Sequence, residues 1–84
     1  MEATIATIRQ FILDHYIFTT DGSLLGNDDS FLEKSIVDST GMLELIAFIG
    51  KTFGITLEDD ELVPDNLDSV HKVASFIHRK RTAV

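Results

Sequence analysis

The chain has 84 residues, of which 44% are hydrophobic, and its 14 acidic residues against seven Lys or Arg give a formal net charge of −7. This length suits one small domain, residues 1–84, with a core of modest size. The negative charge argues against a nucleic-acid partner. Because the chain has no cysteine, disulfides, Cys-based metal sites and an intrinsic thiol are excluded.

The first residues lack the basic start and apolar stretch of a signal peptide, and the longest strictly apolar run covers only residues 45–49. We therefore expect a cytoplasmic protein that does not enter the membrane. Acids dominate residues 14–68, where Lys34 and Lys51 are the only bases. A mostly anionic surface attracts basic partners, although solubility alone would explain the charge equally well.

The first expected element is an amphipathic helix over residues 3–17. Its apolar side chains recur at helical spacing and should face the core: Ile5, Ile8, Ile12, Leu13 and Tyr16. Turn-forming clusters follow at residues 19–23 and 26–30, so a long loop should connect this helix to the next. We expect its apolar residues to fix the loop on the core, namely Leu24, Leu25, Phe31, Leu32, Ile36 and Val37.

A second helix is expected over residues 39–52, with Asp38 or Ser39 as its N-cap. Its inward stripe comprises Met42, Leu45, Ile46, Ile49 and Phe53, flanked by Leu43, Ala47 and Phe48. Glu44 should point away from this stripe, and Gly54 should end the helix in the left-handed conformation. Ser39 would then lie at a helix N-terminus, which favours a negative group such as a phosphate, although a serine in this position is most often a simple cap. Gly41 costs roughly 1 kcal/mol in a helix. Either it leaves room for a group on Ser39 or it is neutral drift, and the sequence does not separate the two.

Two further helices complete the expected fold. Acids at residues 58–61 should begin a short third helix, which Pro64 and a turn at Asp65-Asn66 should end. Asp68 or Ser69 should cap the last helix, whose stripe comprises Val70, Val73, Ala74 and Ile77. The sum is an all-α protein: a small four-helix bundle of three main amphipathic helices and one short helix, with a long first loop.

Four segments together resemble the acyl carrier protein and peptidyl carrier family. They are residues 30–33 (Ser-Phe-Leu-Glu), 36–39 (Ile-Val-Asp-Ser), 44–45 (Glu-Leu) and 53–55 (Phe-Gly-Ile). The family signature is an Asp-Ser pair that opens a helix, followed by Glu-Leu five and six residues after the Ser. The resemblance covers nearly the whole chain.

The resemblance implies that Ser39 carries a covalent 4′-phosphopantetheine arm from coenzyme A, with Asp38 holding the serine in register. It implies a carrier rather than an enzyme, most simply a monomer, which holds an acyl or aminoacyl group as a thioester. Its partners would be a phosphopantetheinyl transferase, a loading ligase and downstream synthase or transferase enzymes with basic patches. By the same analogy Glu44 is the first candidate for partner contact, followed by Asp59, Asp60 and Glu61.

The chain departs from the carriers of fatty-acid synthesis after the serine. Those carriers commonly have Leu and then an acid, where this chain has Thr40 and Gly41, and they often have acids where it has Gly50 and Lys51. A specialised biosynthetic pathway is therefore at least as well supported as fatty-acid synthesis.

Three other classes of function remain for a chain of this composition. A serine hydrolase could use His15, His71 or His78 as base, but the chain has no nucleophile-elbow motif. Calcium could bind the acids at 28–29 or 58–61, but neither cluster follows the EF-hand pattern. The main alternative is an unmodified acidic helical module for protein interaction.

Overall fold

The computed structural model describes residues 2–17 and 25–82, and its regular elements are all helical. The α-helices are α1 (Glu2–Ile12), α2 (Ser39–Phe53), α3 (Pro64–Leu67) and α4 (Val70–Thr82). A π-helical turn, η1 (Leu13–Ile17), continues α1, and a 3₁₀ turn, η3 (Asp59–Glu61), precedes α3. No strand occurs in these two ranges, so the predicted all-α bundle of three main helices is confirmed. The predicted turn at 19–23 and Leu24 lie outside the described residues.

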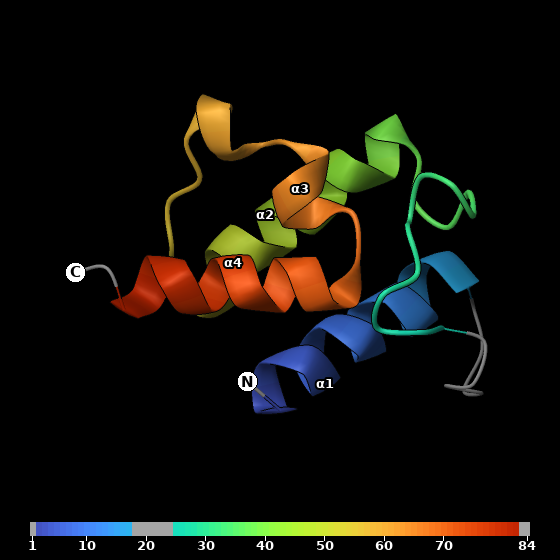
Figure 1. Cartoon of the computed structure of the whole chain (residues 1–84), viewed down its shortest axis with the longest axis horizontal. Coiled ribbons are helices and arrows are strands. Elements are labelled where there is room, and N and C mark those ends of the chain that lie inside the picture. Colours follow the sequence, from blue (N-terminus) through green and yellow to red (C-terminus); the bar gives the residue numbers. More distant parts are fainter. Residues whose placement is uncertain (1, 18–24, 83–84) are drawn as a thin grey trace.

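The helices pack around α4. Figure 1 shows α4 across the middle of the molecule, α1 below it, α3 above it and α2 passing behind. The core confirms the predicted stripes. Its fully buried side chains include Ile8, Ile12, Leu45, Ile49, Val70, Val73 and Ile77.

The segment before α2 is held on the core, as predicted, by side chains and by hydrogen bonds. Leu25, Phe31 and Val37 are buried, and Ile36 packs against the core. Arg9 on α1 donates to the carbonyl oxygen of Leu25 and, at 2.9 Å, to Oδ1 of Asn27. The prediction was wrong for Leu32, which is exposed because residues 31–35 form a turn that directs it outward.

The ends of the later helices follow local capping chemistry. Gly54 ends α2 in the left-handed conformation (φ 64°), as predicted. Ser69 is the cap of α4, since its Oγ accepts the Lys72 N–H at 3.0 Å. The prediction for Pro64 was wrong: it begins α3 instead of ending a helix. Proline lacks an N–H and has a helical φ, so the first helical position suits it, and Asp65 and Asn66 are helical.

Candidate functional site

Ser39 is the first residue of α2, and its side chain is exposed. Asp38 is the N-cap, because its Oδ1 accepts the Gly41 N–H at 2.6 Å and its carbonyl oxygen accepts the Met42 N–H at 2.8 Å. The helix itself has no acceptor for the N–H groups of Ser39 and Thr40. The Ser39 hydroxyl therefore lies at the positive end of a 15-residue helix and is open to a large reagent.

An apolar groove of about 320 Å³ begins at Ser39 and runs between α2 and α3. Apart from Ser39, its lining consists of apolar residues: Leu32, Met42, Leu43, Ile46, Leu62, Val63, Pro64 and Leu67. Three of them expose much of their surface, namely Leu43 (67%), Leu32 (47%) and Val63 (39%). These are the most exposed large hydrophobic side chains in the described part of the chain. Apolar surface concentrated in this way marks a binding site more often than chance exposure.

Tyr16, in the π-helical turn η1, contacts the first turn of α2 on the side away from the groove. Its hydroxyl donates to the Gly41 carbonyl oxygen at 2.8 Å and lies 3.4 Å from Oε2 of Glu44. The ring lies so close to Gly41 that a Cβ added there would be 2.9 Å from Cε1 of Tyr16. Gly41 is thus required by the packing of Tyr16, which accounts for the poor helix former in this turn.

The environment of Tyr16 favours its neutral form. Burial raises the pKa of the Tyr16 hydroxyl to about 12, and the negative charges of Glu44 and Asp38 add to the rise. The hydroxyl is therefore a hydrogen-bond donor across the physiological pH range.

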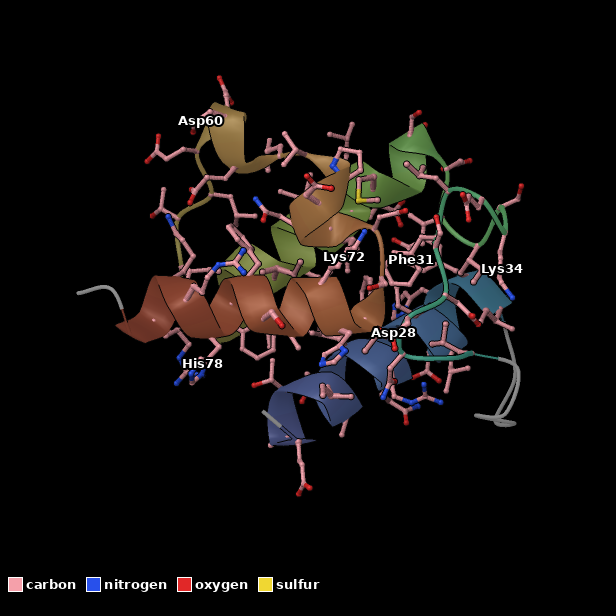
Figure 2. All side chains as sticks on the ribbon, viewed as in Figure 1. Asp28, Phe31, Lys34, Asp60, Lys72 and His78 are labelled. Atoms are coloured by element: carbon pink, nitrogen blue, oxygen red, sulfur yellow. The ribbon has the colours of Figure 1, made fainter. Side chains whose placement is uncertain are left out.

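Asp68 holds the segment that leads to Ser39, a role that the sequence analysis missed. Oδ2 of Asp68 accepts a hydrogen bond from the Ser30 hydroxyl, and Oδ1 accepts the Leu32 N–H at 3.0 Å. Its carbonyl oxygen accepts the Phe31 N–H at 2.8 Å. Figure 2 shows Phe31 between this segment and the body of the molecule. The signal in the sequence was ambiguous, because an Asp before a helix usually predicts a cap.

The acids predicted to contact partners lie in different environments. Glu44 is exposed on α2, five residues after Ser39. Asp59 and Asp60 are exposed on η3, where the Asp60 side chain points away from the molecule (Figure 2). Glu61 is instead bound by Lys80, whose Nζ lies 2.8 Å from its Oε1, and this hydrogen bond lowers the pKa of Glu61. Asp38, Ser39 and Glu44 thus all lie at the start of α2, whereas residues 59–61 lie on a separate element.

The geometry gives little support to a serine hydrolase or to a metal site. Nδ1 of His15 is 3.0 Å from the Phe11 carbonyl oxygen, and Nδ1 of His71 is 3.1 Å from Oδ1 of Asp28, so both imidazoles contact groups other than Ser39. Within residues 2–17 and 25–82, no three His, Cys, Asp or Glu side chains converge in a way that could hold a metal ion. Across the same residues, no helix has the length and hydrophobicity to cross a bilayer.

No protein-family model matches this chain, and no curated protein matches it at a significant level.

Proposed function

We propose that this protein is an acyl or aminoacyl carrier whose cargo is attached through a 4′-phosphopantetheine arm on Ser39. The observation that carries the proposal is the position of Ser39, an exposed hydroxyl at the N-terminus of α2 on the rim of an apolar groove. The spacing of Asp38, Ser39, Glu44 and Leu45, which resembles the carrier signature, supports the same function.

The residues fit the attachment chemistry. Oγ of Ser39 would form a bond to the diphosphate phosphorus of coenzyme A that bears the pantetheine. The P–O bond to adenosine 3′,5′-bisphosphate would break and this group would leave, while a base of the transferase takes the hydroxyl proton. The phosphodiester retains one negative charge, which the N-terminus of α2 favours. The arm would supply the thiol that this cysteine-free chain lacks.

The remaining parts of the site would serve presentation of the cargo. The groove offers an apolar surface within reach of an arm on Ser39. Glu44 would meet a basic patch on the transferase, on a loading ligase or on downstream synthases and transferases. The departures at Thr40 and Gly41 favour a specialised biosynthetic pathway, and the chain itself would perform no catalysis.

Intact mass spectrometry tests the proposal. The protein is incubated with coenzyme A, magnesium and a broad-specificity phosphopantetheinyl transferase, in parallel with Ser39→Ala and Thr40→Ala. Thr40 offers an exposed hydroxyl one residue further along α2, so its variant is the matched control. We expect one phosphopantetheine on the wild type and on Thr40→Ala, and none on Ser39→Ala. A folded wild type that gains no mass, even with a transferase from its own source, would overturn the proposal.

A second candidate function is an unmodified module for protein interaction. The observation that favours it is the exposure of Leu32, Leu43 and Val63 on the rim of the groove, with Asp38 as the N-cap of α2 and Glu44 on the same helix. Such a rim fits a partner with an apolar side chain surrounded by bases. This function would remain if Ser39 proved inert in the mass experiment.

A further inference from the structure

The contact between Tyr16 and Gly41 joins η1 to α2, and the two residues are 25 positions apart in the chain. Ser39, Gly41 and Glu44 all belong to the first one and a half turns of α2. Tyr16 supports this segment through its hydrogen bond to Gly41 and through the packing of its ring, while Ser39 faces the groove on another side. The turn that bears the hydroxyl is therefore held from behind by a side chain from another helix.

The helical backbone changes its geometry after α1, at the residues around Tyr16. Residues 13–17 form a π-helical turn, which widens the helix by one residue and shifts the side chains that follow. Such turns are uncommon and are concentrated at functional sites. Here the turn coincides with the residue that contacts the first turn of α2.

We propose that Tyr16 is a positioning residue, which keeps the first turn of α2 formed and so holds the Ser39 hydroxyl and the Glu44 carboxylate in the geometry that modification requires. The kinetic part of this inference rests on the carrier function proposed above. The structural part, that the Tyr16 hydroxyl keeps the turn formed, does not.

The physical argument concerns fraying. The first residues of a helix make few backbone hydrogen bonds and open more readily than its centre. The Asp38 carboxylate stabilises this turn by accepting the N–H of Gly41, and the Tyr16 hydroxyl stabilises it by donating to the carbonyl oxygen of Gly41. When the turn opens, Ser39 loses its fixed direction, and a nucleophile that is misplaced reacts more slowly.

The experiment compares Tyr16→Phe with the wild type and with Ser69→Ala. Phenylalanine keeps the ring against Gly41 and removes only the hydroxyl. Ser69→Ala removes the N-cap of α4 and so lowers global stability without touching the first turn of α2. Each protein is assayed for transfer of phosphopantetheine from coenzyme A and for amide hydrogen exchange by NMR.

We expect Tyr16→Phe to lower kcat for transfer about fivefold, the equivalent of one neutral hydrogen bond, with KM for the carrier unchanged within about twofold. We expect the amides of Gly41 and Met42 to exchange about fivefold faster. Ser69→Ala should leave kcat and these α2 amides at wild-type values.

Each possible failure has a distinct meaning. If the wild type is modified, two results would overturn the inference and leave the carrier function standing. One is an unchanged kcat in Tyr16→Phe, and the other is a loss of kcat in Ser69→Ala equal to that in Tyr16→Phe. If the wild type is never modified, the carrier function falls and the exchange rates decide the structural part. Unchanged exchange at Gly41 and Met42 would then overturn the proposed role of Tyr16.

Discussion

Tyr16 is the only tyrosine in the chain, so its ionisation can be followed by ultraviolet absorbance without assignment. Burial and the neighbouring Glu44 raise its pKa from 10.0 to about 12. We expect the folded protein to show this midpoint and the urea-unfolded protein to titrate near 10. Because the pKa is raised on folding, the stabilisation from neutral Tyr16 is complete below pH 10 and is lost between pH 10 and 12.

Glu44→Gln separates the two causes of this shift. The glutamine amide retains an acceptor near the Tyr16 hydroxyl but removes the negative charge, so the pKa of Tyr16 should fall below that of the wild type. It should remain above 10.0, because burial is the larger cause of the rise. A folded protein that titrates at the ordinary value would show that Tyr16 is open to water.

A double-mutant cycle measures the fit of Gly41 against Tyr16. Gly41→Ala gains helix propensity of up to about 1 kcal/mol, but its Cβ would be 2.9 Å from the Tyr16 ring, and such crowding costs about 1–3 kcal/mol. We expect Gly41→Ala to destabilise the wild type by about 1 kcal/mol in urea unfolding. In Tyr16→Ala the same substitution should be close to neutral, because the ring is gone.

The coupling energy between the two positions should therefore be about 1 kcal/mol. Oδ1 of Asp38 and Cγ1 of Val37, each 3.2 Å from the added Cβ, remain in both backgrounds and keep a small cost. Additivity within about 0.3 kcal/mol would contradict a steric role for Tyr16.

Whether the sequence alone predicts a contact depends on how far apart in the chain the two residues lie. The cap formed by Asp38 is a contact between residues three positions apart, and the pattern predicted a cap at Asp38 or Ser39. The role of Tyr16 depends on a helix 25 positions away, so the period of the first helix assigned it only to the core stripe. For Gly41 the sequence left two explanations open, room for a group on Ser39 or neutral drift, and packing against Tyr16 was neither of them.

The helices themselves were largely predictable, because amphipathic stripes of three or more turns carry a strong periodic signal. The short elements after α2 were predicted only in part: the acids at 58–61 lie at the helical turn η3, but α3 was missed. A helix of four residues such as α3 has no period to detect, and Pro64 is compatible both with the end of one helix and with the start of another. Burial of Leu32 was wrongly expected because composition does not show which side of a turn faces the core.

The segment before α2 depends on Asp68 more than on its surface ion pairs. Asp68→Ala removes the acceptor of the Ser30 hydroxyl and of the Leu32 N–H. Hydrogen bonds to a charged group contribute about 1.5–3 kcal/mol each, and part of this is recovered by water. We expect a loss of about 2 kcal/mol in urea unfolding, with faster amide exchange at Phe31 and Leu32.

Asp28→Ala is the matched control on the same segment. Its partner is His71 at 3.1 Å, but both side chains are largely exposed (86% and 52%), so the pair contributes little. The expected loss is below about 0.5 kcal/mol. Equal losses for the two variants would show that Asp68 does not anchor the segment.

Charge is distributed unevenly over the whole molecule. The last turn of α4 carries Arg79, Lys80 and Arg81, whereas α2 has only Lys51 as a base, in its own last turn. Figure 1 places the start of α1 and the start of α2 on opposite sides of the molecule. A basic partner would therefore approach the Ser39 end by a different face from the one at the start of α1.

The proposed encounter predicts a position-dependent effect of charge. Glu44→Gln and Glu2→Gln change the net charge equally, but only Glu44 lies on the helix that bears Ser39. For phosphopantetheine transfer at about 20 mM salt, we expect Glu44→Gln to lower kcat/KM about threefold, mainly through association, and Glu2→Gln to have little effect. Raising the salt to about 300 mM should reduce the wild-type rate and bring it close to that of Glu44→Gln, because screening removes the same attraction. If both variants lose activity equally, total charge steers the partner, and Glu44 is not a specific contact.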